Sequence, residues 1–156
     1  MFTESAVIRD TGGRFAPQVG SPSDIVLAPT YEDNVVAGAE LLESLADVPS
    51  EVGRTRHVLM YEDTVVKVAL DEEGCDANDF EASYSEEHGK DGYIPIADSR
   101  IEVWKTPSGR PVAVLVMERV TPYFSASYSE MPDWVGYVDC AQVGHDREGR
   151  LVAYDL

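Results

Sequence analysis

A single lysine, Lys67, lies inside the apolar, β-branched run VVKVA of residues 65–69. Branched residues of this kind favour extended backbone packed against neighbours, so the run predicts a buried strand. Because burying an unpaired charge is costly, the ammonium group of Lys67 must meet an anion inside the fold. We therefore expect a sheet in which Lys67 faces a carboxylate or a phosphate.

Turn and helix signals divide the rest of the chain into short strands and helices. Thr30 is a candidate helix cap, and the apolar residues after it recur with a 3.6-residue period up to Leu45. The sequence PSGR at 107–110 is a strong turn signal between two strand-like segments. In chain order, we expect a helix over 30–45, a hairpin of strands 55–61 and 64–70, a helix over 76–88, a hairpin of strands 101–105 and 112–120, a short helix over 132–140 and a last hairpin within 142–155.

Length and the distribution of glycine and proline indicate the domain organisation. At 156 residues the chain is long enough for one domain with a hydrophobic core. Residues 1–29 combine several glycines and prolines with little hydrophobic period, which predicts an irregular N-terminal arm with one short strand at 25–27. Residues 30–156 are expected to form the single domain.

The chain is strongly acidic, with 29 acidic residues against 12 basic ones and a net charge of -17. This charge repels nucleic-acid phosphates and anionic lipid surfaces, so neither nucleic acid nor a membrane is an expected partner. Only three residues are lysine, and an acidic, lysine-poor surface stays hydrated in concentrated salt, where repulsion between carboxylates is screened. The composition therefore favours a halophilic cellular host or a virus of one, and an acidic protein of an ordinary cytoplasm is the alternative.

The cysteines and the apolar segments indicate the compartment. Cys75 and Cys140 are far apart and form no CxxC spacing, so they indicate neither a disulfide framework nor a zinc site. The N-terminal segment lacks the apolar stretch of a signal peptide, and no stretch approaches the ~20 apolar residues of a membrane span. We therefore expect reduced thiols and a soluble cytoplasmic protein, in the host cytoplasm if it is viral.

Four segments with candidate site residues follow one another in a particular order. Glu81 lies fourteen positions after Lys67 in an expected helix, LVMERV at 115–120 is a second buried strand, and Gln142 precedes Asp155 by thirteen positions. In this order the segments resemble a stripped-down protein kinase, over roughly residues 50–156. The resemblance implies an α+β fold with a small antiparallel sheet, one or two packed helices and a truncated C-terminal lobe.

The same resemblance implies a nucleotide ligand, ATP, for the expected domain. Lys67 corresponds to the strand lysine that contacts the inner phosphates, and Glu81 corresponds to the helix glutamate that pairs with it. Backbone groups from Glu118 to Val120 would form hydrogen bonds with the adenine.

The resemblance also implies residues that bind a metal ion and residues that contact phosphate. Gln142 and Asp155 would offer an amide oxygen and a carboxylate to Mg²⁺. Arg54 and Arg56 stand where backbone amides usually hold phosphate, and their side chains could clamp the anion instead. If the domain transfers phosphate, Asp139 would be the general base that accepts the proton of the acceptor hydroxyl.

Departures from the family pattern keep two other functions open. Tyr137 stands where the base aspartate is expected, the chain has no His-Arg-Asp triplet, and Gly53 is the only glycine of the expected phosphate loop. A non-catalytic, pseudokinase-like adaptor that acts through a protein partner fits these departures. A viral accessory or structural protein is a third possibility, suggested by the arm and the acidic composition.

Overall fold

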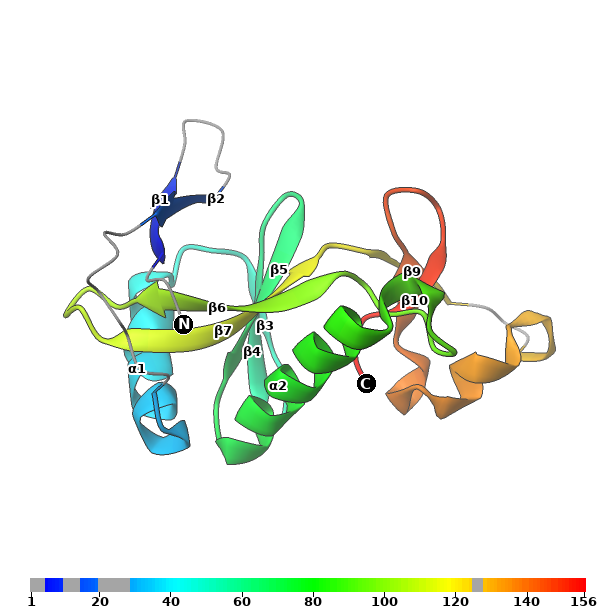
Figure 1. The fold of residues 1–156 in the computed structure, drawn as a ribbon, viewed down its shortest axis with the longest axis horizontal. Coiled ribbons are helices and arrows are strands. Elements are labelled where there is room, and N and C mark those ends of the chain that lie inside the picture. The colour runs from blue at the N-terminus through cyan, green and yellow to red at the C-terminus, as the bar shows by residue number, and fades with distance from the viewer. Residues whose placement is uncertain (1–4, 10–14, 20–28, 125–127) are drawn as a thin grey trace.

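The computed structural model describes residues 5–9, 15–19, 29–124 and 128–156 of the chain, and the strand predicted at 25–27 lies outside them. The described fold is α+β, with two α-helices, a five-stranded antiparallel sheet and a smaller three-stranded antiparallel sheet (Figure 1). This expectation from the sequence is confirmed. In the described part of the chain, neither helix is long and apolar enough to cross a membrane.

The five-stranded sheet has the strand order β3-β4-β5-β7-β6. At its centre, β5 (Thr64–Ala69) pairs with β4 (Arg56–Met60) on one side and β7 (Pro111–Glu118) on the other. The outer strands are β3 (Ser50–Val52) and β6 (Ser99–Lys105). The hairpins β4–β5 and β6–β7 confirm the two hairpins predicted in this region.

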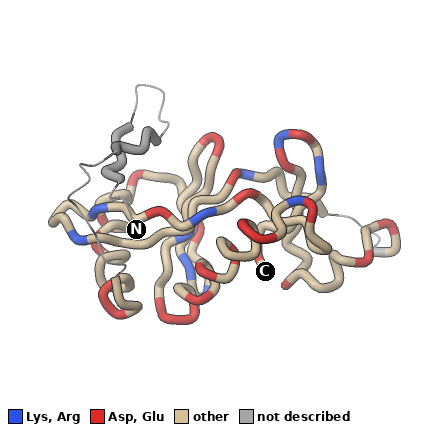
Figure 2. The backbone as a smooth tube through the Cα atoms, viewed as in Figure 1, with Lys and Arg blue, Asp and Glu red and all other residues tan. Residues whose placement is uncertain are grey.

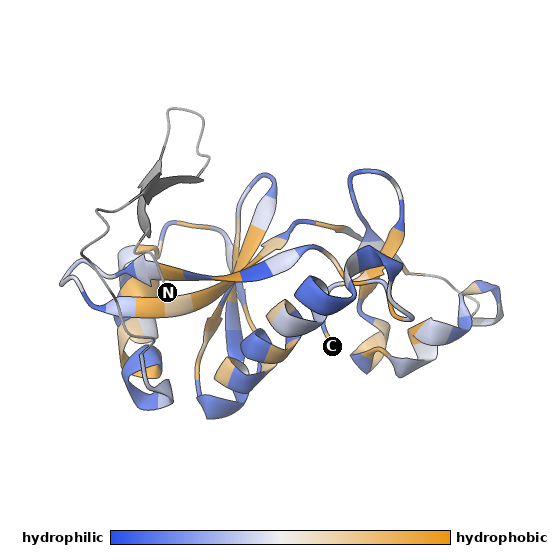
Figure 3. Ribbon diagram, viewed as in Figure 1, coloured by the Kyte–Doolittle hydropathy of each residue, from blue (hydrophilic) through white to orange (hydrophobic). Residues whose placement is uncertain are grey.

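Alternation along β5 gives the sheet two different faces. Val66 and Val68 are fully buried in a cluster that includes residues of the helix α1 (Tyr31–Ser44). Because side chains alternate along a strand, Val65 and Lys67 lie on the other face. Figure 3 shows hydrophobic stretches along β6 and β7, interrupted by hydrophilic residues. The buried residues of the cluster on the α1 side are Ala37, Leu41, Leu59, Val66, Val68, Trp104, Val112, Val114 and Val116.

The helix α1 confirms the helix predicted over 30–45, and polar contacts fix it to the sheet. Thr30 caps its first turn by accepting a hydrogen bond from the Asp33 backbone N–H at 3.2 Å. Asn34 is buried, and its side chain accepts from the Ala113 N–H at 2.6 Å and donates to the Ala113 carbonyl at 3.2 Å. This pair of bonds satisfies a buried amide and joins α1 to β7.

The helix α2 (Glu72–Glu87) begins four residues before the predicted start at 76. The reason is a cap: the Asp71 carboxylate accepts a hydrogen bond from the Gly74 N–H at 2.8 Å. At Gly74 the helix passes so close to β4 that an added Cβ would collide with the Thr55 carbonyl oxygen. This close approach holds α2 against the sheet face that carries Lys67.

The smaller sheet has the order β10-β9-β8 and follows directly after β7 in the chain. Its strands are β8 (Thr121–Pro122), β9 (Val143–His145) and β10 (Leu151–Ala153), and the β9–β10 pair confirms the last predicted hairpin. Buried side chains from both sheets pack together, among them Leu115 and Val152. The two sheets therefore share a core and hold the end of the chain beside α2 (Figure 1).

The short helix predicted over 132–140 is wrong. The segment instead forms two 3₁₀ turns, η3 (Asp133–Tyr137) and η4 (Asp139–Ala141). Val138, between the two turns, has extended backbone with φ of -90° and ψ of 132°, which no α-helix accommodates, and Cys140 and Ala141 after it are left-handed, with φ of 50° and 52°. Two further 3₁₀ turns are η1 (Gly89–Asp91), after α2, and η2 (Tyr128–Glu130).

The N-terminal arm contains one element that the sequence analysis did not predict. The strands β1 (Ser5–Arg9) and β2 (Phe15–Val19) pair with each other in antiparallel register. The glycine pair GG at 12–13 between two short apolar segments is the sequence signal that predicts such a hairpin. The arm therefore contains a regular hairpin, and the prediction that it is irregular is wrong for these residues.

Candidate functional site

Lys67 faces carboxylates, as the sequence analysis expected. Its Nζ atom lies 2.8 Å from Glu81 Oε2 and 3.3 Å from Asp155 Oδ1, and it donates to the Tyr154 carbonyl oxygen at 2.6 Å. The side chains of Lys67 and Glu81 are 5% and 0% exposed. An ion pair this deeply buried stabilises the fold only when its hydrogen-bonding groups are all satisfied, which the third contact helps to achieve.

Arg56 is the second cation at this position. Its Nη1 atom lies 2.9 Å from Glu81 Oε1 and 3.4 Å from the Asn78 side-chain oxygen, while Nη2 pairs with Asp155 Oδ1. We call Arg56, Lys67, Glu81 and Asp155 the charge cluster. It contains two cations and two carboxylates, so its formal charge is zero within a strongly acidic chain (Figure 2).

The register of the β4–β5 hairpin brings the two cations together. Val58 lies directly opposite Lys67, so the two residues share a face of the sheet. Arg56 is two residues before Val58 and therefore lies on that face too. A shift of the register by one residue would turn Arg56 toward α1 while Lys67 stayed in place.

The helix α2 supplies the partners of these cations from one of its sides. Asn78 and Glu81 are three positions apart, so they lie one turn from each other on the same side of the helix. The Asn78 side chain donates to the Lys67 carbonyl at 3.0 Å, and Glu81 Oε1 also accepts from the Leu156 N–H at 3.3 Å. Both carboxylate oxygens of Glu81 are thus occupied by protein donors.

Gln142 and Asp155 meet in the segments that flank β9 and β10. The Gln142 side-chain Nε2 donates to Asp155 Oδ2 at 3.0 Å, and the Gln142 carbonyl accepts from the Tyr154 N–H at 3.0 Å. The chain therefore brings together Lys67, Glu81, Gln142 and Asp155, four residues that the sequence analysis had assigned to one site.

A pocket of about 640 Å³ lies beside the charge cluster. Apolar side chains from both sheets line it, together with polar and charged side chains that include members of the charge cluster. Its volume falls in the range of about 300 to 1,000 Å³ that is usual for small-molecule sites. Every residue that the sequence analysis assigned to the site, apart from Glu81, lines the pocket: Arg54, Arg56, Lys67, Glu118, Val120, Asp139, Gln142 and Asp155.

Arg54 and Asp139 lie at the pocket without joining the charge cluster. Arg54 has an 81% exposed side chain and pairs with Glu73 in the first turn of α2. Asp139 begins η4, and its carboxylate accepts from the Cys140 thiol at 3.5 Å. These two side chains are therefore available to a ligand only from the pocket rim.

Burial sets the protonation behaviour of Lys67. Desolvation lowers the pKa of Lys67 from its ordinary 10.5 to about 8, although the neighbouring Glu81 carboxylate acts in the opposite direction. The positive charge of Arg56 also lowers this pKa. Lys67 therefore remains protonated at neutral pH but loses its proton more easily than a surface lysine.

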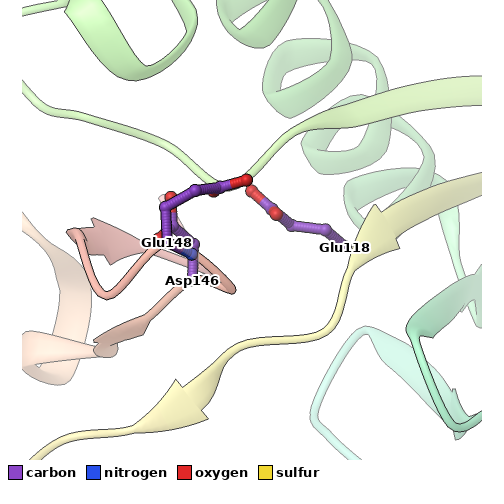
Figure 4. Close-up of side chains that lie close together, drawn as sticks. All are labelled: Glu118, Asp146 and Glu148. Atoms are coloured by element: carbon purple, nitrogen blue, oxygen red, sulfur yellow. The ribbon is translucent and has the colours of Figure 1, made fainter.

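A second buried lysine, Lys90 of η1, has several carboxylate partners. Its Nζ atom lies 2.7 Å from Glu118 Oε1, 3.0 Å from Asp146 Oδ2, 3.4 Å from Asp98 Oδ2 and 3.6 Å from Glu148 Oε2. We call these five residues the Lys90 cluster. Figure 4 shows Glu118 reaching from the end of β7 toward Asp146 and Glu148 in the turn between β9 and β10.

The Lys90 cluster is an ion-pair network that joins the two sheets. Ligand atoms of Glu118, Asp146 and Glu148 all lie within 4.8 Å of one another, a spacing that could hold a cation. The ammonium group of Lys90 already contacts all three carboxylates, so the protein supplies that cation itself. The Glu118 carboxylate is therefore already paired with Lys90.

The pKa values of this cluster are shifted by mutual stabilisation. Burial alone would lower the pKa of Lys90, but hydrogen bonds to Glu118 and Asp146 raise it above its ordinary value. Burial alone would raise the pKa of Asp146, but Lys90 and Arg150 outweigh it and hold that pKa at about 2. The sequence analysis missed this network; its only signal was that Lys90 is one of three lysines.

Comparison of the chain with protein-family models, with curated proteins and with solved structures gives no match.

Proposed function

We propose that this chain is a kinase-like domain that binds a nucleotide such as ATP in the pocket beside the charge cluster. The observation that carries the proposal is the ion pair between Lys67 on the central strand and Glu81 on α2, with Asp155 beside it. A strand lysine, a helix glutamate and a later aspartate in this order are what the resemblance to protein kinases implies. Their close approach in space supports it.

The apolar part of the pocket suits a nucleobase. Val58 and Val65 line it from the β4–β5 hairpin, and Met117 and Val120 line it from the end of β7 and the segment after it. Ligand pockets generally combine such apolar walls with a few polar groups that fix orientation. With a flat, weakly polar ring between these side chains, the phosphates would lie near Arg56 and Lys67.

The edge of the base would lie along residues 118–120. The Glu118 N–H donates to the Asp98 carbonyl at 2.9 Å, and the Arg119 N–H donates to the Asp63 carbonyl at 2.9 Å. The Val120 N–H donates to no residue in the described part of the chain. Val120 is therefore the backbone donor of this segment that is best suited to a base nitrogen.

The charge cluster offers two cations to phosphate groups in the pocket. Arg56 and Lys67 line the pocket, and Arg54 lies at its rim. These cations would attract an anion even though the chain as a whole is acidic. In an active phosphotransferase, Asp139 would accept the proton of the acceptor hydroxyl from its position on the pocket lining.

A non-catalytic adaptor is the second candidate, including an accessory protein of a virus. Tyr137, at the position expected for the base, is 71% exposed, and its ring lies 6.1 Å from that of the exposed Tyr93. Phe124 is 84% exposed. Exposed aromatic side chains are enriched where proteins bind one another, so this surface suits a protein partner.

Binding of a fluorescent ATP analogue, measured by anisotropy in concentrated KCl, tests the proposal. We expect the wild-type chain to bind and Lys67→Met to weaken binding at least about tenfold, because the ammonium group that would contact the phosphates is lost. Val58→Phe should weaken binding to a similar degree by filling the apolar part of the pocket while leaving the charge cluster intact. Lys105→Met is the matched control, because Lys105 is exposed on β6 and does not line the pocket.

Circular dichroism of each variant must first show that the fold is retained. The absence of binding of both ATP and ADP analogues by the wild-type chain would end the nucleotide proposal. A complex with a partner protein that persists without nucleotide would then favour the adaptor.

A further inference from the structure

Three side chains donate hydrogen bonds to the Asp155 carboxylate, and they affect whether a metal ion can bind there. Asp155 Oδ1 accepts from Arg56 Nη2 and from Lys67 Nζ, and Asp155 Oδ2 accepts from Gln142 Nε2. Each carboxylate oxygen that the kinase resemblance assigns to magnesium is therefore already engaged by a protein donor. The Gln142 side chain takes part as a donor through its amide nitrogen.

Magnesium does not fit this donor set. Mg²⁺ requires about six oxygen ligands at close to 2.0–2.1 Å in octahedral geometry, and it binds mainly through ionised carboxylates. An ion on Asp155 Oδ1 would compete with Arg56 and Lys67 for that oxygen, and an ion on either oxygen would place two positive charges beside these two cations. Repulsion between like charges is strong in such surroundings, and the carboxylates are already neutralised one for one.

A count of donors distinguishes Arg56 from Lys67. An ammonium group has three N–H bonds, and Lys67 directs them to Glu81, Asp155 and the Tyr154 carbonyl. A guanidinium group has five, and the contacts of Arg56 with Glu81, Asn78 and Asp155 run through Nη1 and Nη2. Arg56 also lines the pocket, so its remaining N–H groups are candidate donors to a phosphate there.

We propose that the Arg56 guanidinium takes the place of the divalent cation, so that the site binds a nucleotide as a free anion without magnesium. This inference rests on the proposed nucleotide pocket. A planar guanidinium can hold a phosphate group through two parallel hydrogen bonds while it keeps its contact with a carboxylate. Lys67 then acts as the positioning residue that holds Glu81 and Asp155 in place around Arg56.

The net charge of the chain selects among nucleotides. Without magnesium, each additional phosphate adds negative charge that the chain, at -17, repels. A nucleoside diphosphate or monophosphate is therefore the preferred ligand, with ATP weaker. Concentrated KCl shortens the Debye length to about 3 Å at 1 M, so the site can bind these anions despite the distant carboxylates.

The test is the dissociation constant of a fluorescent ADP analogue in concentrated KCl, measured once with magnesium chloride and once with EDTA. We expect the two constants to agree within about threefold. Arg56→Gln should weaken binding at least about tenfold in both buffers. Lys105→Met, on the exposed part of β6, should leave both constants unchanged.

Asp155→Asn separates the two explanations even if Arg56→Gln unfolds the chain. When Arg56 is the phosphate ligand, removing the competing carboxylate charge keeps or tightens binding in EDTA. When Asp155 holds magnesium, Asp155→Asn abolishes the binding that is seen in magnesium chloride. Titration of magnesium chloride alone should not raise the thermal midpoint of the wild-type chain.

The possible failures are distinct. ADP binding that disappears in EDTA and returns with magnesium would overturn the inference and leave the nucleotide pocket standing. The absence of ADP and ATP binding in both buffers would overturn the proposed function and this inference with it.

Discussion

Lys90 of η1 and Asp146 of the β9–β10 turn form a buried ion pair with 3.0 Å between Nζ and Oδ2, although 56 positions separate them in the chain. Asp146 also organises its own turn, because its Oδ1 accepts from the Glu148 N–H at 3.0 Å and the Arg150 N–H at 2.8 Å. The same lysine contacts Glu118 at the end of β7. The Lys90 cluster therefore fixes how the smaller sheet sits on the larger one, and with it how Asp155 meets Lys67.

Removing the Lys90 charge should destabilise the fold more than any exposed lysine change. Lys90→Met leaves the buried Asp146 carboxylate and the largely buried Glu118 without their shared cation. We expect a loss of about 3 kcal/mol in the free energy of unfolding. Urea unfolding measures it, with Lys105→Met as the control expected to stay within about 0.5 kcal/mol of the wild type. Equal effects of the two changes would show that the Lys90 cluster contributes nothing to stability.

Asp146 makes stability depend on acid pH. Its pKa is about 2 in the folded chain, below its ordinary 3.8, because Lys90 and Arg150 outweigh the effect of burial. The folded state therefore favours the ionised carboxylate, and this contribution is complete above the ordinary pKa. It is lost as the pH falls from 3.8 toward about 2, where the folded state also takes up the proton.

Urea unfolding of the wild type and Asp146→Asn across this range checks the pH dependence. We expect the wild type to be the more stable at neutral pH and the advantage to shrink as the pH falls through the interval. A constant difference between the two proteins at every pH would contradict the lowered pKa of Asp146.

Local patterns in the sequence predicted more of this fold than of its ion pairs. The run around Lys67 specifies a buried strand, and the period after Thr30 specifies α1, because both signals depend on neighbours in the chain. The partnership of Arg56 with Asp155 spans 99 positions and depends on hairpin register, which sequence alone left open. For that reason Arg56 was predicted as a phosphate clamp but not as the partner of Glu81.

Side chains that act on the backbone account for the other differences. Asp71 caps α2 through the Gly74 N–H, which extends the helix into a segment whose composition indicates a turn. Extended backbone at Val138 interrupts the segment predicted as a helix, because it separates η3 from η4. The Lys90 cluster was missed because its members come from segments with no shared periodicity.

The acidic surface predicts stability that rises with salt. At a net charge of -17 the folded chain repels itself, and raising KCl from 0.1 M to 1 M shortens the Debye length from about 10 Å to about 3 Å. We expect the thermal midpoint to rise by several degrees over this range. A variant with Glu43→Gln, Asp47→Asn and Glu86→Gln, three exposed positions, should respond less to KCl. A midpoint that falls or stays constant with KCl would contradict a fold adapted to concentrated salt.

Gly74 sets the distance between α2 and the sheet and therefore the position of Glu81. A Cβ at Gly74 would collide with the Thr55 carbonyl oxygen, which is backbone and cannot rotate away. We expect Gly74→Ala to lower the free energy of unfolding by about 1–3 kcal/mol, as overpacked sites do. Nucleotide affinity should fall as well, because the helix that carries Glu81 must move.

The matched control for this change is Gly136→Ala in η3, where an added Cβ would meet no atom within 4 Å. Its unfolding free energy should stay within about 0.5 kcal/mol of the wild type, and its nucleotide affinity should be unchanged. Urea unfolding and anisotropy with the fluorescent nucleotide give both quantities for each variant. Gly74→Ala that keeps full stability and affinity would show that α2 can shift freely, and the Lys67–Glu81 pair would then not depend on this close approach.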